Sequence, residues 1–167
     1  MTTELLLVSD THLGRGQEGR LRDLIADELA AADVIVHAGD VTDSAVLTML
    51  AEHAPVHGVL GNNDHGMRLP ERIEVDIDGC RVAAVHDSGS SKGRGERLWR
   101  WFPTADLVVF GHSHLPWHET IVAEDGHVQH HVNPGSAIQR RMAPQRTVAW
   151  VTIDDGQVVG VRHVGLD

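Results

Sequence analysis

Four short motifs place carboxylate, amide and imidazole side chains directly after apolar segments. They are Asp10-Thr11-His12, Gly39-Asp40, Gly61-Asn62-Asn63-Asp64 and Gly111-His112-Ser113-His114, and His86 ends a fifth apolar segment in the same way. In an extended Asp-x-His or His-x-His segment, alternate side chains point to one face, so both members of a pair can reach one point. Imidazole nitrogen combined with carboxylate and amide oxygen suits ions such as manganese, iron, zinc or nickel better than calcium.

The first half of the chain must bring three of these motifs together. We predict strands at residues 4–9, 34–36 and 56–60, with amphipathic helices at 18–32 and from 43 or 44 to about 52. This alternation of strand and helix favours parallel pairing with right-handed crossovers. Ligands of an open α/β sheet lie beyond the carboxyl ends of its strands, so the polar loops should share one edge.

The second half of the chain has a different pattern. Strands at 73–77 and 81–85 are separated by an Asp78-Gly79 turn, a short helix carries Leu98 and Phe102, and a strand at 107–110 precedes the last motif. Four further short segments are rich in β-branched residues and predict a second sheet of antiparallel strands, at 118–123, 128–132, 147–153 and 158–163.

Composition limits the classes of function. With 167 residues, we expect a single domain covering 1–167. The apolar segments are shorter than a membrane span and no secretory pattern opens the chain, so we expect a soluble, cytoplasmic protein. The single cysteine, Cys80, excludes an intrachain disulfide. A net charge of −10 disfavours a nucleic acid partner. A homo-oligomer stays open.

The order of the motifs resembles the calcineurin-like metallophosphoesterases, particularly their small bacterial phosphodiesterases. The family pattern Asp-x-His, Gly-Asp, Gly-Asn-x-Asp, His and Gly-His-x-His occurs here in order, and Asn133-Pro134-Gly135-Ser136 is similar to the segment that follows in the small bacterial branch. The resemblance spans nearly the whole chain. It implies an α/β fold, namely a four-layer αββα sandwich of two mixed β-sheets flanked by helices.

The resemblance also implies a cofactor of two divalent metal ions, with manganese favoured over iron, zinc, nickel or cobalt. One ion would be held by Asp10, His12, Asp40 and His114, and the other by Asp40, Asn62, His86 and His112. Asp40 would bridge the pair. A metal-bound hydroxide would then attack the phosphorus of a small-molecule phosphoester in line.

Catalytic roles are expected in and around the Gly-Asn-x-Asp motif, at Asp40, Asn62, Asn63, Asp64 and His65. Asp64 should accept a hydrogen bond from a ligand imidazole, with His12 as the expected donor. Many relatives have a histidine at the place of Asn63, where it can assist the leaving group. Asparagine cannot transfer a proton, so His65 becomes the substitute candidate. Asp87-Ser88 replaces the glycine and histidine that often follow His86 in relatives.

The favoured function is hydrolysis of a phosphodiester, because a diester with a good leaving group has the least need of a proton donor at Asn63. Phosphomonoesterase activity on a nucleotide or a phosphoprotein is the nearest alternative. A non-catalytic scaffold similar to the retromer subunit of this family is the rival from another class. Taken singly, Asp40 and Asn62 would be helix caps or turn residues more often than ligands. We expect His37 to be a hydrogen-bonded core residue.

Overall fold

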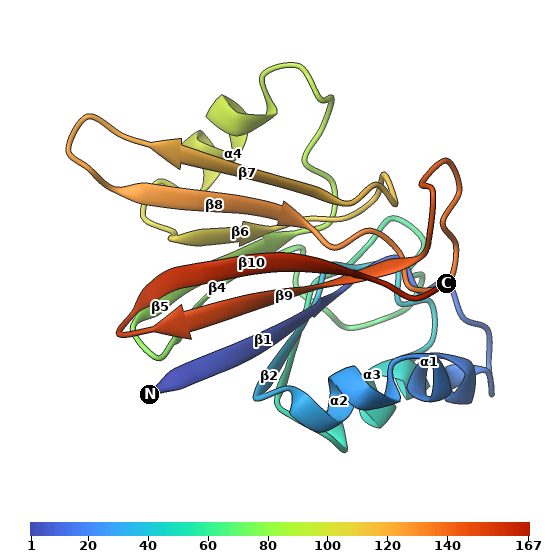
Figure 1. Cartoon of the computed structure of the whole chain (residues 1–167). Coiled ribbons are helices and arrows are strands. Elements are labelled where there is room, and N and C mark those ends of the chain that lie inside the picture. Colours follow the sequence, from blue (N-terminus) through green and yellow to red (C-terminus); the bar gives the residue numbers. More distant parts are fainter.

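The computed structural model describes residues 1–167 and contains two five-stranded β-sheets. The first sheet has the order β10 (Gln157–Gly165), β9 (Thr147–Asp154), β1 (Thr2–Val8), β2 (Val34–His37) and β3 (Val56–Gly58). The second has the order β4 (Arg72–Ile77), β5 (Cys80–Val85), β6 (Leu107–Val109), β8 (Val128–Asn133) and β7 (Trp117–Val122). Each sheet mixes parallel and antiparallel pairs, as Figure 1 shows.

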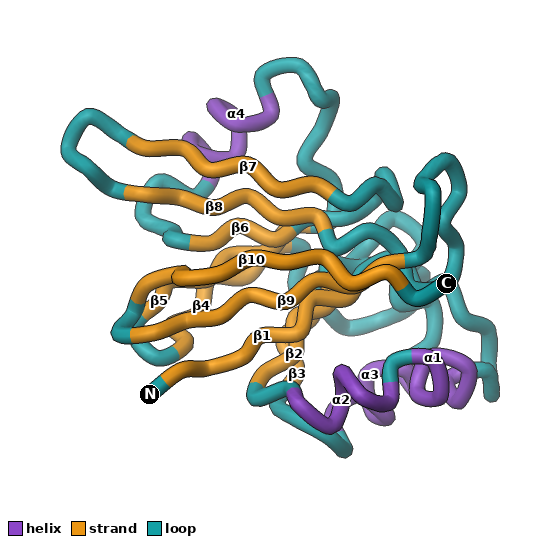
Figure 2. Tube along the Cα trace, viewed as in Figure 1, coloured by secondary structure: helices purple, strands orange, loops and turns teal.

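Helices cover the outer face of each sheet. The first sheet packs against α1 (Glu18–Leu24), α2 (Ala26–Ala31) and α3 (Ser44–Ala51), which lie together on one side of the molecule in Figure 2. The second sheet packs against α4 (Arg94–Trp101). The predicted four-layer αββα sandwich of two mixed sheets is therefore confirmed.

Strand β1 forms the middle of the first sheet because its side chains are apolar on both faces. Leu5 and Leu7 pack between the two sheets, whereas Leu6 and Val8 face α1–α3. All four side chains have no exposed surface. A strand buried on both faces requires a neighbour on each edge, and β1 pairs in parallel with β2 and antiparallel with β9.

Three sequence predictions about the elements were wrong. The strands near residues 147–153 and 158–163 join the first sheet as β9 and β10, while the segments near 118–123 and 128–132 join the second sheet as β7 and β8. The predicted helix 18–32 is two helices, because Ile25 leaves the helical conformation with φ −117° and ψ 32°. Ile25 remains fully buried, so the break does not disturb the apolar spacing on which the prediction rested.

The last strand of the βαβαβ unit, β3, is also shorter than predicted and ends at Gly58. Beyond it, Val59 still follows the sheet, since its N–H donates to the carbonyl of His37. None of the helices combines the length and apolar character needed to cross a lipid bilayer.

Candidate metal centre

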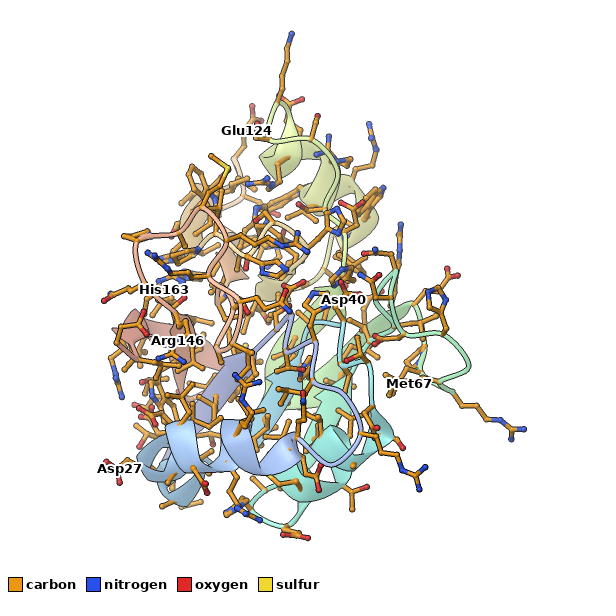
Figure 3. All side chains as sticks on the ribbon, turned by 90° about the vertical axis from the view of Figure 1, so that its right-hand side faces the viewer. Asp27, Asp40, Met67, Glu124, Arg146 and His163 are labelled. Carbon is orange, nitrogen blue, oxygen red and sulfur yellow. The ribbon has the colours of Figure 1, made fainter.

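The predicted site residues lie in loops at the carboxyl ends of strands from both sheets. Asp10 follows β1, Asp40 follows β2 and Asn62 follows β3, whereas His86 follows β5. The pair His112 and His114 comes after β6. Backbone hydrogen bonds tie the loops together, for example from the N–H of residue 111 to the carbonyl of residue 86 at 2.9 Å. Figure 3 looks onto this edge of the molecule, with Asp40 among the loops.

Three side chains converge on one point. The ligand atoms of Asp10, His12 and His114 lie within 4.8 Å of one another. Asp10 Oδ1 is 3.4 Å from His114 Nε2 and 3.8 Å from His12 Nε2. All three atoms are buried and lack a hydrogen-bond partner. Buried polar atoms that are left unpaired destabilise a fold, so their convergence fits a cation placed between them.

Neighbouring groups orient these side chains. Asp10 Oδ2 accepts hydrogen bonds from the Ser9 hydroxyl at 2.7 Å and from the His112 N–H at 3.0 Å, which leaves Oδ1 for the site. His114 Nδ1 donates to the carbonyl of Gln139. Because a carbonyl only accepts, this bond places the proton on Nδ1 and leaves the Nε2 lone pair facing the cluster.

Asp40 lies between this cluster and a second group of side chains. Its Oδ2 is 3.3 Å from His12 Nε2 and 3.5 Å from His86 Nε2. Asp10, Asp40 and His86 form a further set whose ligand atoms lie within 4.8 Å of one another. This central position is the one that a ligand shared by two cations would need.

The second group is completed by an amide and another imidazole. Asn62 Oδ1 is 3.0 Å from both His86 Nε2 and His112 Nδ1, and these two nitrogens are 3.3 Å apart. His86 Nδ1 donates to the carbonyl of Ala38 at 2.7 Å, so its Nε2 lone pair also points into the site. Each predicted ligand therefore lies at one continuous cluster.

The remaining predicted residues lie beside the cluster, and one of their expected contacts differs. Asp64 does not contact His12; its carboxylate instead accepts backbone N–H groups from Asp40, Thr42 and Gly61 at 2.7–3.0 Å. The reason is that the loop after β2 presents the N–H groups of Asp40 and Thr42, and the turn after β3 that of Gly61, to this one carboxylate.

Asn63 is held by Asp40. Its backbone N–H and side-chain amide each donate to the Asp40 carboxylate at 2.8 Å. The amide is therefore turned towards Asp40. His65, in contrast, is exposed on the wall of a groove of about 570 Å³ that also borders Asn62 and His86.

Burial shapes the protonation of the site. Burial alone would raise the pKa of Asp10, but the neighbouring His12 imidazole and the hydrogen bond from Ser9 outweigh it and hold the pKa below its usual value. Burial lowers the pKa of His114, which favours the neutral imidazole that a cation requires. His37, predicted to be a core residue, is fully buried behind the site, where its Nε2 lies 3.2 Å from the Thr11 hydroxyl. Burial lowers its pKa to about 4.

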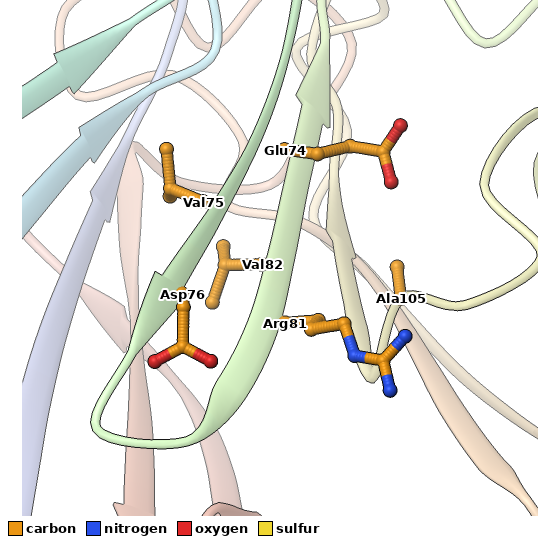
Figure 4. A pocket seen from close by; sticks show the side chains of 6 residues that line it. All are labelled: Glu74, Val75, Asp76, Arg81, Val82 and Ala105. Carbon is orange, nitrogen blue, oxygen red and sulfur yellow. The ribbon is translucent and has the colours of Figure 1, made fainter.

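A second hollow, drawn in Figure 4, does not belong to this site. It is lined by Glu74, Asp76 and Arg81 beside the turn of the β4–β5 hairpin. His86 follows the other end of β5, so the hollow lies at the opposite edge of the sheet. It contains no imidazole and its charges are of mixed sign, which makes it a poor match for a metal or a phosphate.

Sequence reasoning missed the backbone geometry of the loops. Five of the seven predicted ligands have positive φ angles of 45–71°, an uncommon conformation for residues other than glycine: Asp10, His12, Asp40, His112 and His114. It also missed Gln139, whose carbonyl comes from a distant loop. The glycines beside the ligands were the available sign that these loops approach one another closely. A Cβ at Gly61, for example, would lie 2.1 Å from the Asp40 nitrogen.

Comparison with known proteins agrees with this arrangement. A family model described as calcineurin-like phosphoesterase superfamily domain matches residues 4–156. A probable metallophosphoesterase of Methanocaldococcus jannaschii is 29% identical over 153 residues, which cover 89% of this chain and 75% of that protein.

Solved structures share the fold. A predicted phosphoesterase from Streptococcus pneumoniae has a TM-score of 0.71 at 20% identity, covering 99% of this chain and 98% of the other. Vps29 of Entamoeba histolytica in complex with Zn²⁺ has a TM-score of 0.69 at 19% identity, covering 99% and 100%. A novel archaeal phosphodiesterase has a TM-score of 0.66 at 18% identity, covering 98% and 99%. With the family model matching nearly the whole length, the chain belongs to the calcineurin-like phosphoesterase superfamily.

Proposed function

We propose that this protein hydrolyses phosphodiesters at a centre of two divalent metal ions, with manganese as the working ion. The observation that carries the proposal is the convergence of three buried, unpartnered ligand atoms, from Asp10, His12 and His114, beside a second set of ligands. If these side chains had a purely structural role, nothing would offset the free-energy cost of burying their polar atoms without a hydrogen bond. Family membership supports hydrolysis of a phosphoester.

The proposed ligand sets follow the two groups of contacts. The first ion would be held by Asp10, His12, Asp40 and His114, and the second by Asp40, Asn62, His86 and His112. The position of Asp40 Oδ2, 3.3 Å from His12 Nε2 and 3.5 Å from His86 Nε2, supports its role as the bridge.

The bound cations would supply charge stabilisation for the phosphoryl oxygens and a nucleophile from water at neutral pH. Around them, Ser9 and the carbonyls of Ala38 and Gln139 orient the ligands before substrate arrives. Asp64 holds three backbone N–H groups and so fixes the turn that carries Asn62. Asn63 positions the Asp40 carboxylate.

A proton for the leaving group would come from His65. Its imidazole is exposed on the groove beside Asn62 and His86, where an ester substituent would extend from the cations. Asn63 has no proton to transfer and its amide is bound to Asp40. His65 is therefore the acid that we assign to the reaction.

Three points favour a diester over a monoester. The groove has a volume of about 570 Å³ for a second ester substituent, and one structural neighbour is an archaeal phosphodiesterase. The acidic side chains of Glu71 and Asp87 on the same groove outnumber its one arginine, Arg72, and would repel the second charge of a monoester.

The test compares bis-p-nitrophenyl phosphate with p-nitrophenyl phosphate after chelation and return of manganese. We expect metal-dependent turnover that is faster on the diester and abolished in Asp40→Ala. Arg15→Ala, an exposed change in the loop after β1, serves as the control and should keep turnover if the loss is specific to the ligand set. Faster monoester turnover would reassign the protein as a phosphomonoesterase.

The rival hypothesis is a scaffold that does not turn over substrate, to which the resemblance to Vps29 lends support. It predicts metal binding without hydrolysis of either ester under any divalent ion. Metal content measured on the same samples separates that outcome from a failure to load the site.

A further inference from the structure

The segment that joins β8 to β9 forms a loop beside the metal centre, residues 137–146, which we call the arginine loop. It contains three arginines and neither aspartate nor glutamate. The motif Asn133-Pro134-Gly135-Ser136 leads into it, and Figure 3 labels its last residue, Arg146. The function proposed above uses only one backbone carbonyl of this loop, that of Gln139, and none of its side chains.

The start of the arginine loop is fixed to two ligands of the first ion. The Ser136 hydroxyl donates to the carbonyl of Asp10 at 2.7 Å and accepts the N–H groups of Ile138 and Gln139 at 3.3 and 2.9 Å. The carbonyl of Gln139 then accepts the proton of His114 Nδ1. The residues that follow Gln139 are therefore held at the metal centre by its own ligands.

Two consecutive arginines of the loop have different surroundings. Arg140 Nη1 donates to the carbonyls of Ala143 and Pro144 at 3.5 and 3.0 Å, so its guanidinium closes the loop on itself. Arg141 is exposed, and its side chain takes part in no hydrogen bond or ion pair of the protein. A planar guanidinium with five N–H donors is thus left for a ligand.

The charge of Arg141 acts on the metal centre. Burial is the main cause of the lowered pKa of His114, and the positive charge of Arg141 lowers that pKa further. Because salt screens an exposed charge beyond roughly 10 Å, such an effect indicates a nearby guanidinium. Arg141 therefore lies at the end of the centre that holds the first ion.

The two ends of the metal centre differ in charge. The groove borders Asn62 and His86, ligands of the second ion, and its walls carry Glu71 and Asp87 against one arginine, Arg72. No residue of the arginine loop lines this groove. An ester substituent with a charge of its own would be repelled in the groove and attracted to the arginine loop, although the whole chain has a net charge of −10.

We propose that Arg141 binds a further phosphate group on the substituent that stays attached to phosphorus, so that the substrates are phosphodiesters with a second anionic group. This inference rests on the function proposed above, in which the leaving group extends into the groove beside His65. A guanidinium binds phosphate through paired, charge-assisted hydrogen bonds and so orients the substrate as well as holding it. Because Arg141 would not contact the reacting atoms, its loss should raise KM without lowering kcat.

The test uses two substrates with the same leaving group. One is the p-nitrophenyl ester of thymidine 5′-phosphate, and the other carries an additional phosphate at the 3′ position. We expect wild type to have the lower KM for the second substrate. Arg141→Ala should raise that KM by roughly threefold to tenfold at low ionic strength, while the KM of the first substrate and both kcat values stay unchanged. Arg141→Lys should keep part of the preference.

Arg140→Ala is the matched control, since it removes a neighbouring arginine whose guanidinium is already bonded to loop carbonyls. It should leave the ratio of the two KM values as in wild type. An equal effect of Arg141→Ala on both substrates, or no effect on either, would show that Arg141 is merely solvated or acts on the shape of the loop. The same loss of preference in Arg140→Ala would also overturn the proposal.

A second measurement does not depend on hydrolysis. Isothermal titration calorimetry compares thymidine 3′,5′-bisphosphate with thymidine 5′-phosphate as ligands of the manganese-loaded protein. The bisphosphate should bind more tightly to wild type, with an advantage that falls as salt is added and is lost in Arg141→Ala. If no variant turns over a diester but this advantage depends on Arg141, the proposed hydrolysis fails and the anion site stands. If turnover is present and neither KM nor Kd responds to Arg141→Ala, only the anion site fails.

Discussion

At the scale of single residues, the two oxygens of Asp10 have different surroundings. Oδ2 is occupied by hydrogen bonds from Ser9 and His112, while Oδ1 faces the cluster without a partner. The carboxylate is therefore already oriented for a cation before one binds. This division explains why a serine that was absent from the sequence motifs matters to the site.

Ser9→Ala tests this orientation. The Ser9 hydroxyl donates a hydrogen bond that lowers the pKa of Asp10. Without it the pKa should rise and the carboxylate should be free to rotate. We expect metal affinity to fall roughly tenfold, with turnover restored at saturating manganese. Titration with manganese followed by diester turnover measures both quantities. An unchanged affinity would show that the His112 N–H alone holds the carboxylate.

His65 is the second residue whose role can be isolated. If it protonates the leaving group, His65→Ala should slow the hydrolysis of esters of weakly acidic alcohols on the order of 100-fold. The hydrolysis rate of p-nitrophenyl esters should change little. A series of aryl diesters with leaving groups of rising pKa gives the measurement. Asn63→Ala is the comparison, and its effect should be uniform across the series. A uniform effect of His65→Ala would assign it to substrate binding instead.

At the scale of elements, the strand ends approach one another closely enough to require glycine. A Cβ at Gly111 would lie 2.1 Å from the Ser9 hydroxyl and 2.8 Å from Asp10 Oδ2. The loop after β6 can therefore reach the loop after β1 only without a side chain at this position. The Gly-His-x-His motif is thus a packing requirement as well as a set of ligands.

Gly111→Ala should consequently separate the two loops. We expect a loss of about 1–3 kcal/mol in the free energy of unfolding, typical of overpacking, together with weaker metal binding. Gly58→Ala is the control, because its Cβ would meet nothing closer than 3.6 Å. Urea unfolding of both variants provides the comparison. Equal stability of the two variants would show that the loops can move apart freely.

The sequence predicted where strands and helices lie better than it predicted which strands pair with one another. Strands such as β1 and β2 are visible as apolar segments, and the motifs after them indicated correctly which loops converge. The placement of β9 and β10 could not be read from local pattern, because β9 pairs with β1 across nearly the full length of the chain. Likewise, nothing near residue 114 indicates that the carbonyl of Gln139 would orient its imidazole.

At the scale of the whole molecule, two buried histidines couple folding to pH. His37 and His131 have no exposed surface, and burial lowers the pKa of each to about 4. Unfolded histidine titrates near 6.5, so between these values the unfolded chain binds protons that the folded chain does not. Stability is therefore fully present above about pH 6.5 and declines as the pH falls towards 4.

Urea unfolding of chelated protein at pH 7 and pH 5 measures this effect. Each unit by which the folded-state pKa is lowered corresponds to 1.36 kcal/mol once the pH is below the unfolded pKa. At pH 5 each histidine should therefore lower the free energy of unfolding by about 2 kcal/mol. His131→Leu, which removes one of the two groups, should reduce the difference between the two pH values. Chelation removes the contribution of metal release. A variant with the same pH dependence as wild type would contradict the assignment of His131.

The pairing of β1 with β9 has a consequence for how the protein is made. During translation β1 is synthesised before the other strands, whereas its antiparallel neighbour β9 is synthesised only after every candidate ligand. Until then the growing chain exposes an apolar strand with one unpaired edge, the kind of surface that chaperones recognise. The interval before β9 has been synthesised, rather than the folded state, is therefore when this protein is most vulnerable to aggregation.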